Sequence, residues 1–128
     1  MRIWVLAVAG LSLWGGQAVA QDAAMGEASF KRLCAPCHDI GPAAKVKLGP
    51  PMNGLDGRKA GTIPNFKYSE ANQNSGIVWS DASFADYIKN PQQQMPGTRM
   101  AFAGMRDDKE IANLWAFLKL FGEDGSKK

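Results

Sequence analysis

The sequence predicts an all-α domain built from four to five short helices and one long loop. No stretch of its 128 residues shows the sustained alternation of apolar and polar side chains that is typical of strands. Several segments instead repeat apolar residues at helical spacing. Residues 39–67 are rich in Gly and Pro, which indicates a loop. A loop of this length usually wraps something or carries function, so we expect a large apolar group at the centre of the fold.

Residues 1–20 are predicted to be a secretory signal peptide. Arg2 provides the positive start, residues 3–14 are apolar, and small residues precede a cleavage site expected between Ala20 and Gln21. A retained membrane anchor is the alternative, but the apolar stretch is short and is interrupted by glycines. The predicted domain, residues 21–128, carries 14 basic and 12 acidic side chains. A net charge of only +2 does not indicate a nucleic-acid partner.

The first two helices are expected before and after the long loop. Apolar side chains in residues 22–38 follow an i, i+3, i+4, i+7 pattern and share one helical face. These side chains are Phe30, Leu33, Cys34 and Cys37. Residues 68–76 predict a short helix that Ser69 caps and Gly76 ends.

Two further helices are expected in the second half of the chain. Residues 80–90 begin with a Ser80 or Asp81 cap, and the helix stops before Pro91. Its predicted buried residues are Phe84, Tyr87 and Ile88. The last helix is capped by Asp107 or Asp108 and ends at Gly122. Its apolar stripe consists of Ile111, Leu114, Trp115, Leu118 and Phe121.

The motif CAPCH at residues 34–38 holds both cysteines and the single histidine of the chain. A structural zinc site needs four ligands, and this motif supplies three of the usual kind. A thioredoxin-type motif would follow a strand of a βαβ unit, and the sequence shows no such pattern. A disulfide is the ordinary outcome for exported thiols, but it gives no reason for the adjacent histidine.

The remaining interpretation is covalent attachment of one haem c through Cys34 and Cys37. Thiols at i and i+3 lie on one helical face, where each can add to one vinyl group along the haem edge. Formation of the two thioethers also consumes both thiols, which removes the disulfide. His38 is then the predicted fifth ligand of the iron.

The composition constrains the sixth position of the iron. Because the chain has one histidine, a second imidazole is excluded, and a methionine, an amine or an open or water-bound site remain. Most methionines fill gaps in cores. Met100 is favoured here because a Pro-Gly turn precedes it and a glycine follows it, with Met95 and Met105 as alternatives.

Five segments in order, CAPCH, LGPPMNGLDGRKAGT, NFKYSEANQNSGIVW, YIKNP and PGTRMAFAG, resemble the class I c-type cytochromes. The similarity is greatest to the soluble, mitochondrial-like branch that includes bacterial cytochrome c2-like electron carriers. It covers nearly all of residues 21–128. The resemblance implies the class I cytochrome c fold and a haem iron held by His38 and Met100.

The resemblance also implies roles for residues around the haem. Pro50 would accept a hydrogen bond from the ligating imidazole and orient it. The residues expected near the haem propionates are Arg58, Tyr68 and Trp79. Those expected in a polar network near the methionine sulfur are Asn72, Tyr87 and Thr98. Phe102 is expected at the exposed haem edge, where electrons would pass. The residues expected to pack where the first and last helices cross are Gly26, Phe30, Leu114 and Phe117.

The function implied is that of a monomeric periplasmic one-electron carrier rather than an enzyme, since two protein ligands leave the iron no site for a substrate. Its partners would be membrane or periplasmic redox complexes of the quinol–cytochrome c oxidoreductase, terminal oxidase, reaction-centre or dehydrogenase type, and no nucleic acid. A haem enzyme or gas-binding protein with an open sixth site and a membrane-tethered subunit are the rival readings.

One departure from the family concerns charge near the haem edge. Relatives that dock on acidic partners often carry lysines at the positions that Leu33 and Gln92, Gln93 and Gln94 occupy here. The cations left to form a face are Lys31, Arg32, Arg99, Arg106 and Lys109. Steering by charge is therefore expected to be weaker than in a lysine-ringed carrier.

Overall fold

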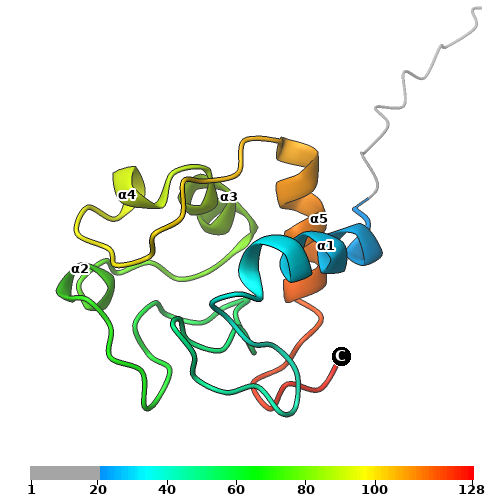
Figure 1. The fold of residues 1–128 in the computed structure, drawn as a ribbon, viewed down its shortest axis with the longest axis horizontal. Helices are drawn as coiled ribbons and strands as arrows, with labels where there is room; N and C mark the ends of the chain where they lie inside the picture. Colours follow the sequence, from blue (N-terminus) through cyan, green and yellow to red (C-terminus); the bar gives the residue numbers. More distant parts are fainter. Residues whose placement is uncertain (1–20) are drawn as a thin grey trace, which may run out of the picture.

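The computed structural model describes residues 21–128, which fold into five α-helices and one π-helical turn (Figure 1). The elements are α1 (Ala23–Ser29), η1 (Phe30–Cys34), α2 (Glu70–Gln73), α3 (Asp81–Lys89), α4 (Pro91–Gln94) and α5 (Asp108–Leu118). Within this range there is no strand, and only two isolated bridges form, Lys59–Val78 and Phe121–Lys127. The prediction of an all-α domain is thus confirmed. The signal peptide predicted for residues 1–20 lies outside the described residues.

Helices α1 and α5 cross in direct contact (Figure 1). Gly26 is buried at the crossing, where a Cβ atom on it would lie 1.9 Å from the carbonyl oxygen of Asn113. Only a residue without a side chain permits this approach of the two backbones. The rings of Phe30 and Phe117 meet at the same place, 5.6 Å apart between centroids. The crossing predicted from the resemblance is therefore present.

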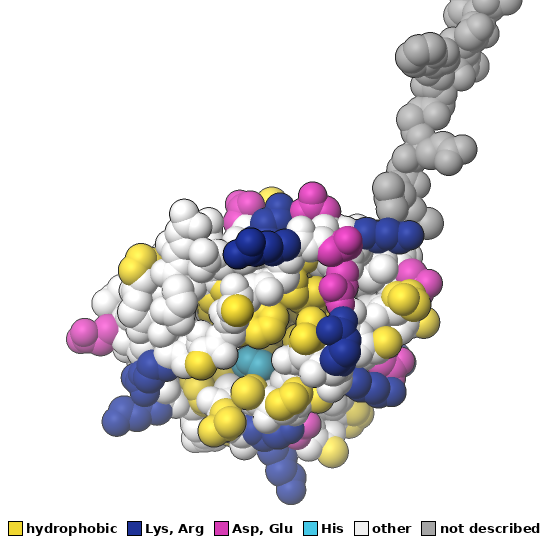
Figure 2. Space-filling model, turned by 45° about the horizontal axis from the view of Figure 1, so that its top comes forward, with side chains coloured by type: hydrophobic (Ala, Val, Ile, Leu, Met, Phe, Trp, Pro, Cys, Tyr) yellow, Lys and Arg dark blue, Asp and Glu magenta, His cyan; other side chains and the backbone are white. Residues whose placement is uncertain are grey.

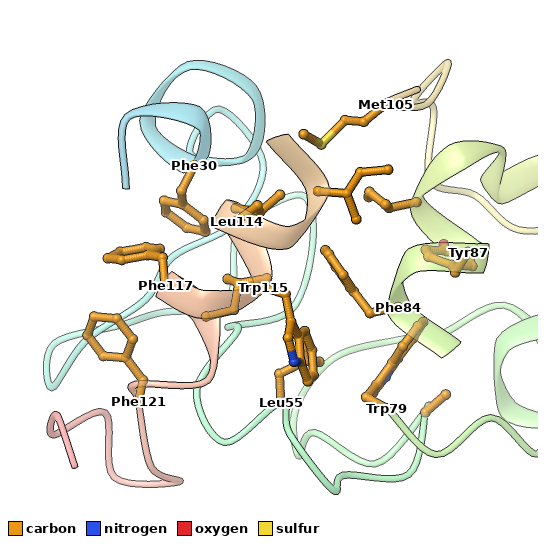
Figure 3. Close-up of a cluster of buried hydrophobic side chains, with 14 of the residues drawn as sticks. Phe30, Leu55, Trp79, Phe84, Tyr87, Met105, Leu114, Trp115, Phe117 and Phe121 are labelled. Atoms are coloured by element: carbon orange, nitrogen blue, oxygen red, sulfur yellow. The ribbon is translucent and has the colours of Figure 1, made fainter. Parts of the chain in front are cut away.

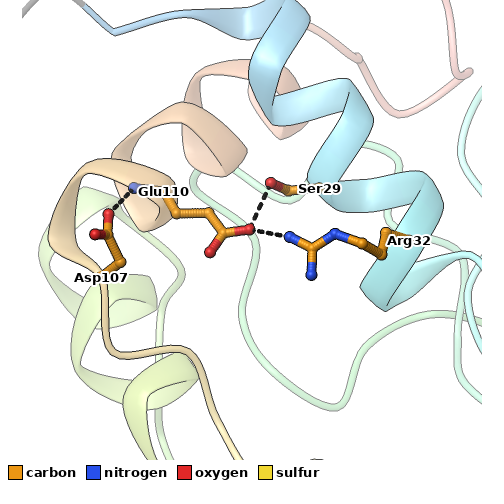
Figure 4. Close-up of polar contacts among 4 residues, drawn as sticks. All are labelled: Ser29, Arg32, Asp107 and Glu110. Atoms are coloured by element: carbon orange, nitrogen blue, oxygen red, sulfur yellow. Dashed lines mark hydrogen bonds and ion pairs between the residues drawn. The ribbon is translucent and has the colours of Figure 1, made fainter.

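Polar contacts join the same two elements at the start of α5 (Figure 4). Asp107 caps α5 by accepting a hydrogen bond from the Glu110 backbone N–H at 2.7 Å. The Glu110 carboxylate in turn accepts one from the Ser29 hydroxyl at 2.8 Å and pairs with Arg32. One carboxylate therefore ties α5 to both α1 and η1.

The chain widens from α-helix to π-helix before the CAPCH motif. The Ala35 N–H donates to the Phe30 carbonyl at 2.8 Å, five residues earlier, and this bond closes the wider turn. Sequence periodicity predicts only a continuous helix here, because one wide turn hardly changes the spacing of apolar residues. Such turns are frequent at functional sites.

Helix α3 agrees closely with the sequence prediction, whereas α2 begins at the predicted cap but ends at Gln73 rather than at Gly76. Ser69 caps α2 by accepting from the Asn72 N–H at 3.1 Å. Ser80 caps α3 and exchanges hydrogen bonds with Ser83 in a capping box. The three residues predicted to be buried along α3 are buried.

Two further boundaries differ from the prediction. The chain does not remain irregular after Pro91, because Pro91 starts the four-residue helix α4 and Asn90 caps it. Helix α5 ends at Leu118 rather than at Gly122. Beyond Leu118 the C-terminal segment folds back, and the Lys128 N–H donates to the Leu120 carbonyl at 2.7 Å. This returning segment replaces the last helical turn, although Phe121 stays buried as predicted.

Residues 39–67 contain no helix, which confirms the predicted loop. The loop runs along the side of the molecule opposite α3 and α4 (Figure 1). The hydrophobic core instead lies among the helices and includes Phe84 stacked on Trp115, with centroids 5.2 Å apart (Figure 3). Among residues 21–128, no helix has both the length and the hydropathy that crossing a bilayer requires.

Candidate haem-binding site

A cavity of about 660 Å³ opens between the loop, α3 and the segment that carries Met100. The imidazole of His38 is visible at the centre of this hollow, with hydrophobic side chains gathered around it (Figure 2). All twelve predicted site residues line the cavity: Cys34, Cys37, His38, Pro50, Arg58, Tyr68, Asn72, Trp79, Tyr87, Thr98, Met100 and Phe102. The fold thus brings together residues that lie as far as 68 positions apart.

His38 is fixed from two sides. The imidazole Nδ1 lies 2.7 Å from the Pro50 carbonyl oxygen, and the backbone N–H of His38 donates to the Cys34 carbonyl at 2.8 Å. Gly49 is pressed against the ring, since a Cβ there would lie 2.3 Å from the imidazole Cε1. Because the carbonyl only accepts, Nδ1 carries the proton and the lone pair of Nε2 is free to bind a metal.

The electrostatics favour the neutral imidazole. Burial lowers the pKa of His38 below 6.5, and this effect outweighs the hydrogen bond to Pro50, which acts in the opposite direction. The positive charges of Lys47 and Arg58 lower the pKa further. A neutral ring is the form that ligates iron.

The two cysteines are free thiols at the cavity wall, with Cys34 half-buried and Cys37 exposed. Burial and the neighbouring Cys37 raise the pKa of the Cys34 thiol to about 11, so it stays protonated at neutral pH. In the part of the chain that the structure describes, no group of three or more His, Cys, Asp and Glu side chains is arranged to hold a metal ion.

The methionines separate into two groups. Met95 and Met105 are 2% and 4% exposed and pack in the hydrophobic core. Of the methionines in residues 21–128, only Met52 and Met100 line the cavity. The Met100 sulfur accepts a hydrogen bond from the Tyr87 hydroxyl at 3.2 Å. Placement in the cavity therefore favours Met100 over the two alternatives that the sequence left open.

Polar groups lie around the Met100 sulfur. The Thr98 hydroxyl oxygen accepts from the Met100 N–H at 3.3 Å. Burial raises the pKa of Tyr87 above 10, against the opposing hydrogen bond with Thr98, so its hydroxyl remains a donor at neutral pH. The Oδ1 atom of Asn72 is buried and has no partner among the described residues. A residue of the cavity wall thus carries an unused acceptor.

Arg58 provides a partly buried cation in the cavity wall. One guanidinium nitrogen donates to the Asn53 carbonyl at 2.6 Å, which leaves other N–H groups available. Trp79 packs edge-on against Tyr87, 5.0 Å between centroids, and the Tyr68 hydroxyl accepts from the Ile63 N–H at 3.1 Å. A cation at this depth suits a ligand with acidic substituents.

Part of the lining has no helical pattern in the sequence. Phe84 and Ile88 come from the predicted stripe of α3, but sequence analysis did not identify the loop residues Val46, Leu48 and Gly49 as part of the site. Leu48 is 81% exposed and Val46 42% exposed. Isolated apolar residues in a Gly/Pro-rich loop carry no periodicity, so only the folded loop reveals their position.

The residues present fit a haem. The wall is largely apolar, two thiols lie at it, and a neutral imidazole and a thioether sulfur face the same space. The buried Asn72 acceptor and the Arg58 cation could make polar contacts with the ring substituents. No carboxylate is among the described residues that line the cavity.

Comparison with known proteins is consistent with this geometry. Residues 21–118 match the family model described as cytochrome c oxidase, cbb3-type, subunit III. The chain is 55% identical over 108 residues to cytochrome c2 of Rhodoplanes tepidamans, covering 84% of this chain and 100% of that protein. It is 54% identical over 111 residues to cytochrome c2 of Blastochloris viridis, covering 87% of each. It is 54% identical over 106 residues to cytochrome c-550 of Bradyrhizobium diazoefficiens, covering 83% of this chain and 77% of the relative.

Proposed function

The chain belongs to the class I c-type cytochromes, and from that premise we propose that it is a periplasmic one-electron carrier whose haem c is attached through Cys34 and Cys37 and ligated by His38 and Met100. The observation that carries the proposal is the cavity, because every residue needed for attachment and ligation lines it. When bound, the haem supplies an iron that cycles between the ferrous and ferric states.

The protein residues hold this group rather than react with a substrate. Pro50 fixes the tautomer of His38, so that Nε2 would be free to bind the iron. The Tyr87 hydroxyl draws electron density from the Met100 sulfur through its hydrogen bond. Ligation by a thioether in an apolar cavity raises the reduction potential relative to stronger donors. Two protein ligands leave no position for a substrate.

The other lining residues complete the site in this proposal. Arg58, Tyr68 and Trp79 hold the haem propionates, with the Arg58 guanidinium offsetting their charge. Asn72 and Thr98 form the polar network around the sulfur with Tyr87. Phe102, half-buried at the cavity, lies where an electron would enter or leave.

The charges around the cavity bear on partner choice. Of the five cations that the sequence offered for a docking face, Lys31 pairs with Glu27 at 2.9 Å and Arg32 pairs with Glu110. The exposed apolar side chains of Val46 and Leu48 lie at the cavity together with the cations Lys47, Lys67 and Arg99. Lys47 donates to the Ala35 carbonyl and Arg99 to the Tyr68 carbonyl. We infer contact through apolar surface, with weak steering by charge, to a redox complex of the oxidoreductase, oxidase, reaction-centre or dehydrogenase type.

The steering proposal is tested by reaction rates. The second-order rate with an acidic redox partner should fall only modestly from low to physiological ionic strength, because charge pairs within the chain weaken the long-range field. A steep fall, as expected for many intermolecular charge pairs, would contradict it. The periplasmic location rests on the signal peptide predicted for residues 1–20, and N-terminal sequencing of the exported protein should begin at Gln21.

The ligation proposal is tested by absorption spectroscopy of the ferric holoprotein. A low-spin spectrum with the weak far-red band of a sulfur ligand, unchanged by azide, is expected. Met100→Leu should abolish that band and admit azide, whereas Met52→Leu, which also removes a methionine from the cavity wall, should retain it. A high-spin wild-type spectrum that azide shifts at once would instead indicate an open site for peroxide or gas chemistry.

A further inference from the structure

The segment that carries Met100 has little secondary structure of its own. Residues 96–105 connect α4 to the approach of α5 and contain no helix or strand. Their backbone is fixed near both ends, where the Thr98 N–H donates to the Met95 carbonyl at 2.9 Å and the Met105 N–H to the Ile88 carbonyl at 2.8 Å. Between these points, packing against the core and hydrogen bonds from side chains hold Met100.

One of these side chains is Gln92. Its Nε2 donates to the backbone carbonyl of Met100 at 3.0 Å, and the same carbonyl accepts from the Phe102 N–H at 3.0 Å. Gln92 stands on α4, whose first residue, Pro91, is fully buried and whose cap is the Asn90 side chain. The Gln92 amide therefore reaches the Met100 backbone from a helix whose first residues are held in place.

The neighbouring glutamines make no such contact. Gln93 and Gln94 lie on the same helix and are equally exposed. The Gln93 side chain accepts from Asn90 at 3.4 Å, and among the described residues the Gln94 side chain makes no hydrogen bond to the Met100 segment. Of the three glutamines, only Gln92 therefore bonds to Met100, the residue that bears the proposed ligand.

We propose that Gln92 is a positioning residue that holds the Met100 backbone against the cavity and so resists displacement of the Met100 sulfur by an external ligand. The part concerning displacement rests on the proposed ligation. The part concerning the backbone stands on the hydrogen bond alone. Position 92 thus contributes a tether to the Met100 segment rather than a charge to the docking face.

The test compares Gln92→Glu with Gln94→Glu in the ferric holoprotein. Both variants change the net charge equally at exposed sites of one helix, but only the first removes the donor to Met100. Imidazole, titrated by absorbance, should bind Gln92→Glu about two- to tenfold more tightly than the wild type, the range that one hydrogen bond accounts for. Gln94→Glu should stay within about twofold of the wild type.

Hydrogen exchange provides a second readout that does not depend on ligation. The Phe102 amide, which shares the Met100 carbonyl, should exchange faster in Gln92→Glu by a similar factor, while the amides of Leu114 and Leu118 in the core should not change. Gln92→Leu, which removes the donor without adding charge, should behave like Gln92→Glu.

Either of the following results would overturn the proposal: equal imidazole affinities in the two glutamate variants, or an unchanged Phe102 exchange rate in both Gln92 variants. Loss of protection at Leu114 and Leu118 as well would mean that Gln92 supports the whole fold, which also contradicts a local role. A wild-type spectrum without the sulfur band would refute the proposed ligation, and the exchange comparison would still decide whether Gln92 holds the segment.

Discussion

The crossing of α1 and α5 and the loop of residues 39–67 are two contrasting regions of the molecule. At the crossing, Leu114 and Leu118 are 0% exposed, and Phe117 packs against both Phe30 and Phe121. In the loop the buried side chains are Leu55 and Ala60, while Val46 and Leu48 are exposed. The side chains of the first region pack against one another, whereas many of those in the second line a cavity.

This difference locates two sources of stability. The crossing is maintained by apolar area that the protein buries against itself. The loop has polar tethers, such as the Asn53 amide that bonds Gly41 in both directions at 2.8 and 2.9 Å, but it turns much of its apolar surface toward the cavity. A bound haem would therefore give the apolar side chains of the loop a surface to pack on, as the helices give one another.

The largest effect is expected when the haem cannot attach. A Cys34→Ala/Cys37→Ala variant should be largely unfolded, because the loop loses the group it packs on and the crossing alone buries too little area to sustain the domain. Far-UV circular dichroism should show most of the helical signal lost. A native-like spectrum would mean that the crossing folds without the haem-bound loop. The two regions would then differ in packing but not in their need for haem.

Truncation at the centre of the crossing should have the next largest effect. Leu114→Ala removes a fully buried side chain and leaves a cavity, so the free energy of unfolding of the holoprotein should fall by about 2–5 kcal/mol. Val78→Ala, at a side chain that is 53% exposed, is the control and should change it by less than about 0.5 kcal/mol. Denaturant titration measures both values, and equal values would refute the assigned burial.

Two glycines compare the regions directly. Gly26→Ala places a Cβ 1.9 Å from the Asn113 oxygen and should destabilise the holoprotein by about 3 kcal/mol without changing the haem spectrum. Gly49→Ala places a Cβ 2.3 Å from His38 Cε1, so it should alter the ligand-field spectrum with a smaller loss of stability. If both variants altered stability and spectrum alike, the two regions would not be separable.

The smallest effect concerns the exposed charge pair between Glu27 on α1 and Lys31 on η1. The hydrogen bond and charge of Lys31 hold the pKa of Glu27 below 4.5. Because that pKa is depressed in the folded state, the pair stabilises above the unfolded pKa, and its contribution is lost as the pH falls through the folded value. In Lys31→Gln the Glu27 pKa, measured by NMR titration, should rise toward 4.5, whereas Lys109→Gln, the same charge change elsewhere, should leave it unchanged.

The sequence by itself determined the local features of this protein. The stripes of α3 and α5, the Ser69 and Ser80 caps and the irregular loop follow from short-range patterns, and each is present. The CAPCH motif determined the attachment prediction because it contains every cysteine and histidine of the chain. The local Pro-Gly turn favoured Met100, and the other site residues came from family resemblance.

The tertiary structure decided what depends on distant neighbours. Periodicity could not end α5 at Leu118, because the end is set by a C-terminal segment that folds back and pairs beyond it. The sequence favours Met100 but leaves Met95 and Met105 as alternatives, until packing buries those two and places Met100 at the cavity. Three consecutive glutamines look alike until one reaches the Met100 carbonyl. A local pattern fixes which face a residue occupies, but only the folded chain fixes what it meets there.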